Sequence, residues 1–438
     1  MTGGEILYGS FYGCGGLTDV TVGEGITEIG SCAFSGCEGL VGVTVPESVE
    51  SIGYHAFYGC SAMERVYISD LAAWFGITYG TGGSASVYDN PLYCAGTLCL
   101  NGRVLTDVTV PDGVTEINDM AMAGALSVTG VTVPDSVKSI GESAFQGCVY
   151  LSEVTLGDGV GSIGDSAFSG CARLESIELA DGLASIGASA FYGCASLTSV
   201  AVPDSVESIG EGAFGGCSSL ESMTLPFVGG KADAVEASAS TFFGYIFGSS
   251  GYTGGARTYQ FYDYTSAALG ALTGGSDVSY VVPESLTSVT VTGGYVCDGA
   301  FSGCEYLESI ELAGGVTGIG ECAFWGCTSL VSIGIGDGAT SVGDYAFYDC
   351  TALASVALPD GVTSIGDYVF YNCTSLECVA LGSGVTSVGS YAFCGCTALG
   401  NITLPDSVES IGGYAFRNCT ALESVALGSG VTSVGQCH

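Results

Sequence analysis

Apolar positions recur every 23 residues along most of this 438-residue chain. Phe145 and Phe168 are one such pair, and a Cys follows each of them three positions later. The segment 151–156, Leu-Ser-Glu-Val-Thr-Leu, alternates apolar and polar side chains, which is typical of a strand with one buried face. We therefore expect Val154 and Leu156 to point into a core. The same Phe position recurs at Phe11, Phe34, Phe57, Phe145, Phe168, Phe191, Phe214, Phe301, Phe324, Phe347, Phe370, Phe393 and Phe416.

The rest of the repeat predicts how the chain returns to the next strand. Asp158-Gly159 supplies a turn, because both residues favour turn conformations. A second extended stretch, 160–163, should face its apolar residues inward, and Ala167-Phe168 should form a short helical turn whose Phe fills the core. One such unit cannot bury its own apolar face, so stability must come from stacking repeat on repeat.

Two segments interrupt the 23-residue phase. We expect repeats over residues 1–68, 99–225 and 284–438, and aromatic, Gly-rich inserts over 69–98 and 226–283. The last block stops where another Ala-Phe pair should follow, so we expect it to be truncated at the C-terminus.

The consensus L-x-x-V-x-L-P-D-S-V-x-S-I-G-x-x-A-F-x-G-C resembles the BspA-like class of leucine-rich repeats in bacterial surface proteins. Together with the phase it predicts a leucine-rich-repeat solenoid, a right-handed coil with a parallel β-sheet, short helical turns and two inserts. The resemblance implies adhesion to, or recognition of, host proteins or matrix by a cell-surface or secreted protein. The N-terminal residues show no basic region followed by an apolar run, so we expect no signal peptide in this sequence.

Composition narrows the choice of partners. Apolar residues make up 47% of the chain and charged residues 12%, which favours a long packed core over disorder. Seven Lys and Arg against 45 Asp and Glu give a formal net charge of −38, which repels phosphate backbones, so we expect no nucleic-acid partner. No stretch of about 18 apolar residues is uninterrupted, so we expect no membrane insertion.

Cysteine is the first candidate for chemistry, with 21 residues mostly in one repeat column. We expect a ladder of buried thiols. Close pairs such as Cys322 and Cys327 lack the spacing and the His partners of a zinc site, so we predict no metal and no cofactor. Cys94 and Cys99, in the first insert, are the strongest candidates for a disulfide. Aspartates recur in the turns, where turn chemistry explains them better than calcium binding does.

Catalytic residues are not predicted. Histidine occurs only twice, which leaves almost no material for imidazole-based triads, and no phosphate-binding loop is present. The chain is therefore interpreted as a non-enzyme, with a catalytic site in the second insert as the less favoured alternative and a passive structural spacer as another.

Aromatic side chains are the best candidates for binding a protein or glycan ligand, because their rings offer contact area and a Tyr hydroxyl adds a polar group. The outward sheet positions carry mainly Thr, Ala and Gly, which bury little area. The alternative reading is ordinary packing, either along the ladder or in small cores of the inserts. Phe243 and the insert candidates lie outside the repeat phase, so stacking alone should not account for them. The predicted binding residues are Tyr245, Phe247, Tyr252, Tyr259, Tyr345, Tyr368, Tyr391 and Tyr414.

Overall fold

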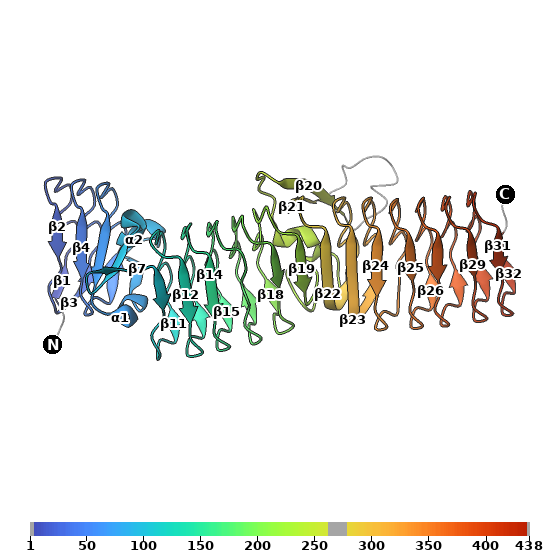
Figure 1. The fold of residues 1–438 in the computed structure, drawn as a ribbon, viewed down its shortest axis with the longest axis horizontal. Coiled ribbons are helices and arrows are strands. Elements are labelled where there is room, and N and C mark those ends of the chain that lie inside the picture. The colour runs from blue at the N-terminus through green and yellow to red at the C-terminus, as the bar shows by residue number, and fades with distance from the viewer. Residues whose placement is uncertain (1–3, 262–277, 436–438) are drawn as a thin grey trace. The chain divides into compact units, whose positions relative to one another are not determined.

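The structure is a computed structural model that describes residues 4–261 and 278–435. Its internal contacts divide the chain into two compact units. The N-terminal unit comprises Met1–Thr198 and Gly212–Cys217, and the C-terminal unit comprises Ser199–Glu211 and Ser218–His438. Each unit is a stack of short coils whose strands align from coil to coil (Figure 1).

The N-terminal unit has two columns of parallel strands. In the first column Val131 lies opposite Val154 and Thr132 opposite Thr155, so neighbours differ by the 23-residue period that the sequence predicted. The first column comprises β2 (Asp19–Thr21), β4 (Gly42–Val45), β6 (Arg65–Ile68), β8 (Leu98–Leu100), β10 (Asp107–Thr109), β12 (Gly130–Val133) and β14 (Glu153–Leu156), and β9 (Arg103–Val104) pairs antiparallel with β8. The second comprises β1 (Gly4–Ile6), β3 (Ile26–Ile29), β5 (Ser51–Gly53), β7 (Thr78–Thr81), β11 (Glu116–Ile117), β13 (Ser139–Ile140), β15 (Ser162–Ile163) and β16 (Ser185–Ile186).

The C-terminal unit repeats this plan, and two of its strands run through both columns. These are β22 (Ser288–Val296) and β23 (Ser309–Ile319), which pair in parallel. The first column also contains β17 (Ser199–Ala201), β19 (Ser222–Leu225), β24 (Ser332–Ile335), β25 (Ser355–Ala357), β27 (Cys378–Ala380), β29 (Asn401–Thr403) and β31 (Ser424–Ala426). The second contains β18 (Ser208–Ile209), β26 (Ser364–Ile365), β28 (Ser387–Val388), β30 (Ser410–Ile411) and β32 (Ser433–Val434). The predicted parallel-sheet solenoid is confirmed.

Stacked Phe rings form the centre of each unit. Phe168 lies 5.2 Å from Phe145 and 5.4 Å from Phe191, measured between ring centroids, with the planes within 3° of parallel. Phe347 is placed in the same way between Phe324 and Phe370, at 5.2 and 5.3 Å. All six rings are fully buried. Val154 and Leu156 are buried as predicted, at 7% and 9% exposure.

The segment around each Phe is a run of tight turns and not a regular helical turn. Phe168 donates its backbone N–H to Ala190 in the next coil, and Cys171 donates to the carbonyl of Phe168. Two residues before this Phe, Ser166 has a φ of +55°. That left-handed conformation is not helical, and the N–H of Ser166 donates to the carbonyl of Ala188 in the next coil.

The predicted thiol ladder is confirmed. Cys171 donates its Sγ–H to the carbonyl of Phe145 at 3.3 Å, and Cys350 donates to that of Phe324 at 3.1 Å. Burial raises the pKa of Cys148 to about 12, so this thiol stays protonated. Cys94 and Cys99 are both free thiols, and Cys94 takes a ladder place by donating to Phe57.

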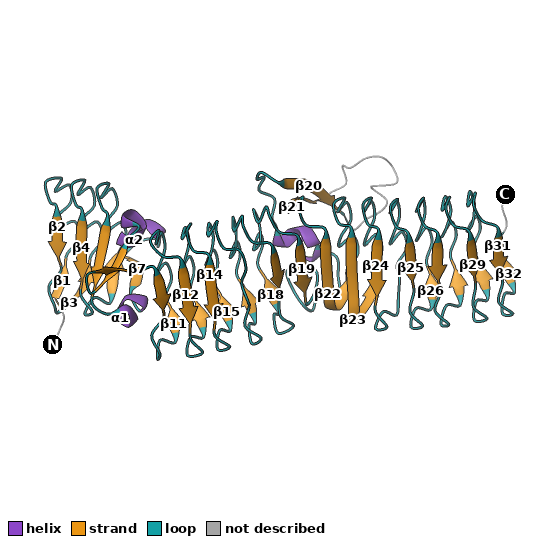
Figure 2. Ribbon diagram, in the orientation of Figure 1, coloured by secondary structure: helices purple, strands orange, loops and turns teal. Residues whose placement is uncertain are grey.

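Within the described residues, helices occur only in the segments predicted as inserts (Figure 2). The first contains α1 (Leu71–Phe75), η1 (Val87–Asp89) and α2 (Pro91–Ala95). Asp70 and Asn90 cap the two α-helices by accepting from Ala73 and Leu92. The second contains η2 (Ala239–Thr241), η3 (Phe243–Ile246) and the antiparallel pair β20 (Gly255–Gln260) and β21 (Val278–Pro283).

The first insert is hydrogen-bonded to a coil that lacks the repeated Phe. Met122 stands where other coils carry Phe, and it is fully buried. Trp74 of α1 donates its Nε1–H to the carbonyl of Ala121 at 2.8 Å, and Asn90 donates to that of Met120 at 2.7 Å. These two side chains tie the insert to the coil that lacks the Phe. The exact division of the chain into repeats and inserts stays a prediction.

Candidate functional site

Most of the aromatic side chains described in the second insert are buried. Phe243 packs on Phe301 with 4.8 Å between ring centroids, and Phe247 meets Phe243 edge-on at 5.2 Å. Phe243 therefore packs against Phe301 at a tilt and against Phe247, in agreement with the alternative reading that the aromatic residues of the insert form a small core. Phe247 is 1% exposed, so we remove it from the predicted binding residues: its ring is enclosed by the insert's own core.

The three Tyr residues predicted in this insert differ in what they present to solvent. Tyr252 is half-buried and donates its hydroxyl to the carbonyl of Val281 at 3.1 Å. Tyr245 is also half-buried, and burial, followed by the charge of Glu211, raises its pKa. Tyr259 is 52% exposed. A binding role for them stays a prediction, and Tyr259 offers the most surface.

Gln260 is a buried polar residue that the sequence analysis missed. Its Nε2 donates to the carbonyl of Ala300 at 2.7 Å, and its Oε1 accepts from the N–H of Gly244 at 2.7 Å. The Gln260 amide therefore joins β20 to η3 and to the coil that contains Ala300. The only signal in the sequence was a Gln between Tyr259 and Phe261, which would not have identified its partners.

A row of stacked Tyr rings runs along the C-terminal unit. Tyr368 lies 4.9 Å from Tyr345 and 4.8 Å from Tyr391, with the planes within 6° of parallel. Tyr391 lies 4.9 Å from Tyr414. The structure thus brings together the four ladder residues that the sequence predicted. All four are half-buried.

A second aromatic row lies beside the first. Trp325 and Tyr348 stack at 4.0 Å, and Tyr348 and Tyr371 at 4.7 Å. The rows touch, because Tyr345 is 5.7 Å from Trp325 and Tyr368 is 5.7 Å from Tyr371. We call this combined surface the aromatic strip; its members are Trp325, Tyr345, Tyr348, Tyr368, Tyr371, Tyr391 and Tyr414.

The second insert meets the strip at one end. Phe261, which follows β20, packs edge-on against Trp325 at 5.7 Å and is buried. The buried core of the insert is thereby continuous with the half-buried rings of the strip.

The first row of the strip uses a left-handed backbone position. Tyr345, Tyr368 and Tyr391 have φ values of 58°, 58° and 56°. This conformation costs about 1–2 kcal/mol for a residue with a side chain. It belongs to the repeat and not to Tyr, because Ser143 and Ser166 adopt φ of 55° at the same position of other coils. The coil therefore folds without an aromatic ring here, so its own backbone does not explain the Tyr row.

Carboxylates adjoin both rows of the strip in the sequence. Asp344 and Asp367 precede Tyr residues of the first row and are exposed. Asp344 accepts the backbone N–H of Asp367 at 2.7 Å, which fixes the carboxylate in the turn. Asp349 follows Tyr348 and accepts from the amide of Asn372 at 2.7 Å.

These charges act on the phenols. Burial first, and then the charge of Asp349, raises the pKa of Tyr348 to about 12. Burial raises the pKa of Tyr368 as well, with further contributions from Tyr391 and Asp367. Both phenols therefore stay neutral hydrogen-bonding groups over the physiological pH range.

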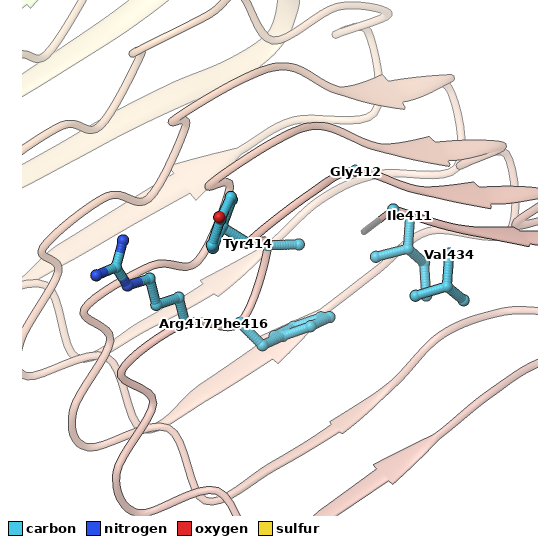
Figure 3. A pocket seen from close by; sticks show the side chains of 8 residues that line it. Ile411, Gly412, Tyr414, Phe416, Arg417 and Val434 are labelled. Carbon is cyan, nitrogen blue, oxygen red and sulfur yellow. The ribbon is translucent and has the colours of Figure 1, made fainter. Parts of the chain in front are cut away.

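An apolar hollow of about 460 Å³ adjoins the last Tyr of the strip (Figure 3). Ile411, Phe416 and Val434 supply its apolar lining, and Tyr414 and Arg417 stand at its side. The guanidinium of Arg417 lies 5.4 Å from the centre of the Tyr414 ring.

No group of three or more His, Cys, Asp or Glu residues in the described part of the chain is arranged to hold a metal ion. Over residues 4–261 and 278–435, no helix combines the length and apolar character needed to cross a bilayer.

Comparisons with known proteins give the family. The model of the BspA type leucine-rich repeat region matches residues 4–76, 96–221, 282–399 and 386–438. A leucine-rich repeat protein from Bacteroides ovatus is 25% identical, with 95% of this chain and 83% of that chain covered and a TM-score of 0.44. A leucine-rich cell surface protein from Faecalibacterium prausnitzii is 22% identical, with 93% and 87% covered and a TM-score of 0.31. A comparison with curated proteins finds no match. Because the matched segments cover well over half of its residues, the chain belongs to the BspA type leucine-rich repeat family.

Proposed function

We propose that this chain is a non-catalytic binding module that contacts a protein or glycan ligand at a cell surface or outside the cell. The observation that carries the proposal is the aromatic strip. Its rings are half-exposed and continuous over neighbouring coils. Equivalent positions in the N-terminal unit carry Ser143, Ser166 and Ser189, so the coil does not need Tyr in order to fold.

Interface hot spots favour Tyr and Trp, whereas small side chains such as those of the outward sheet column contribute little. Recognition of a host protein or of matrix, and a location at the cell surface, are what membership of the BspA type leucine-rich repeat family suggests. Two alternatives remain: a passive spacer, and an enzyme sited in the second insert.

The test is a binding screen with a matched pair of variants. The purified chain is titrated against a panel of purified serum and extracellular-matrix proteins and a glycan array. Tyr345→Ser with Tyr368→Ser and Tyr391→Ser installs the residue that other coils use. Thr132→Ala with Thr155→Ala is the control on the outward sheet face.

For the tightest ligand of the panel, the Tyr variant should lose about 2 kcal/mol or more of binding free energy and the Thr variant should lose little. Circular dichroism is the check that both variants fold. Absence of saturable binding throughout the panel would favour the spacer. Turnover of glycosidase or peptidase substrates that disappears when residues 226–283 are deleted would favour the enzyme.

A further inference from the structure

The geometry of the aromatic strip restricts which part of each ring a ligand meets. Tyr368 has a parallel ring on each side, at 4.9 and 4.8 Å, so its two faces are largely covered by its neighbours. Tyr348 is covered in the same way by Trp325 and Tyr371. A ligand approaching the middle of the strip therefore meets ring edges and hydroxyl groups. Sugar rings bind to open aromatic faces, which this arrangement provides poorly.

Charge adds a second restriction. The chain carries 45 acidic and 7 basic residues, so its surface as a whole attracts cations. Beside the strip, Asp344 and Asp367 are exposed, and each uses an Oδ1 atom to accept a backbone N–H from the next coil. Those bonds hold the two carboxylates one coil apart along the first row. Asp349 adds a third carboxylate beside the second row.

The molecule shows how a cation lies against its Tyr rings. Arg417 occupies the repeat position of Tyr348 and Tyr371, and its guanidinium lies 5.4 Å from the centre of the Tyr414 ring. In the N-terminal unit, Arg173 lies 4.7 Å from the centre of the Tyr150 ring. A guanidinium is planar, carries several N–H donors and is weakly hydrated, which suits both aromatic rings and carboxylates.

We propose that the aromatic strip binds a basic, Arg-bearing extended segment of a partner protein. The guanidinium groups would pair with Asp344, Asp349 and Asp367 and donate to Tyr hydroxyls, while the aliphatic stems pack on the ring edges. This inference rests on the proposed binding function and specifies its partner. It does not extend to glycans or nucleic acid.

The probe is a fluorescein-labelled (Arg-Ser)6 peptide, with (Lys-Ser)6 and (Glu-Ser)6 peptides for comparison, measured by fluorescence anisotropy at 0.15 M salt. Three variants of the full chain are compared with the wild type. The first replaces Tyr345, Tyr368 and Tyr391 by Ser. The second is Asp344→Asn with Asp367→Asn, which keeps an Oδ1 acceptor for the backbone N–H groups.

The third variant is the matched control, Asp119→Asn with Asp165→Asn. These carboxylates hold the same repeat position in the N-terminal unit and accept from Glu142 and Ala188, but no Tyr follows them. The control removes two negative charges, as the Asp344/Asp367 variant does. A comparison of the two variants therefore separates a local site from general attraction to an acidic protein.

We expect (Arg-Ser)6 to bind at least fivefold more tightly than (Lys-Ser)6 and (Glu-Ser)6 not to bind. The Tyr variant should raise the Kd about tenfold or more and the Asp344/Asp367 variant about fivefold, while the control changes it less than twofold. Equal weakening by the control, or no (Arg-Ser)6 binding, overturns the inference. In that case the protein and glycan panel still decides the proposed function, because a panel ligand that loses affinity in the Tyr variant keeps the strip as a binding surface.

Discussion

Removing one ring from the middle of the Phe stack should destabilise its neighbourhood and leave distant coils folded. Phe347 is fully buried and stacks on Phe324 and Phe370. Burial of a Phe side chain contributes about 2–3 kcal/mol. Each of the two aromatic pairs adds about 0.5–1.5 kcal/mol beyond that burial. Phe347→Ala should therefore cost about 4 kcal/mol, within the range of about 3–5 kcal/mol that is usual for this substitution.

Hydrogen–deuterium exchange measures where that loss falls. Each coil contacts only its neighbours, so protection should fall in peptides covering roughly residues 324–376 and remain high in the N-terminal unit. Tyr348→Ser is the control in the same coil, because Tyr348 is half-buried and its loss leaves the Phe stack intact. A uniform loss of protection along the whole chain, or no loss near Phe347, would refute nearest-neighbour stacking as the source of stability.

Three further predictions follow from the hydrogen bonds and the pKa shifts. Burial raises the pKa of Cys148 and Cys217 to about 12, so their stabilising contribution is complete below the unfolded pKa near 9 and is lost as the pH rises towards 12. At pH 10 each such thiol should cost about 1.4 kcal/mol, so the melting temperature should fall between pH 8 and pH 10; Cys148→Ala with Cys217→Ala should flatten that fall, and an unchanged slope would contradict the ladder. Hydrogen bonds from the backbone and hydroxyl of Ser383 lower the pKa of Asp360, so an NMR titration should place its midpoint below 3.8, and Ser383→Ala should raise it; a midpoint unaffected by Ser383→Ala would rule out the hydroxyl as a cause. Gln260→Leu should leave the Gly244 N–H and the Ala300 carbonyl unpaired and cost about 2–3 kcal/mol, seen as faster exchange at Gly244, whereas unchanged exchange there would mean that the amide is not structural.

The sequence alone was enough to predict a contact wherever that contact joins the same position of two neighbouring repeats. Val131 opposite Val154, Phe145 on Phe168 and Tyr345 on Tyr368 all follow from one period, because each coil places the same residue over its predecessor. The rows of the aromatic strip were predictable for that reason. The left-handed backbone under the first row was not, because Tyr carries no preference for positive φ that would reveal it.

The inserts were not predictable in this way. For Phe243 and Phe247 the choice between ligand binding and packing stayed open, because the sequence does not show that Phe243 reaches Phe301. Trp74 and Asn90 likewise donate hydrogen bonds to carbonyls that are distant in sequence. Non-periodic contacts of this kind depend on tertiary packing, which no local pattern encodes.

The most direct test of the account is a footprint of a bound ligand. Hydrogen–deuterium exchange of the full chain is measured with and without the tightest ligand from the protein and glycan panel. The account predicts added protection in peptides covering residues 340–395, around Tyr345, Tyr368 and Tyr391, and its loss in the triple Tyr→Ser variant. Added protection confined to the outward sheet face around Thr132 and Thr155, with the strip unchanged, would contradict it.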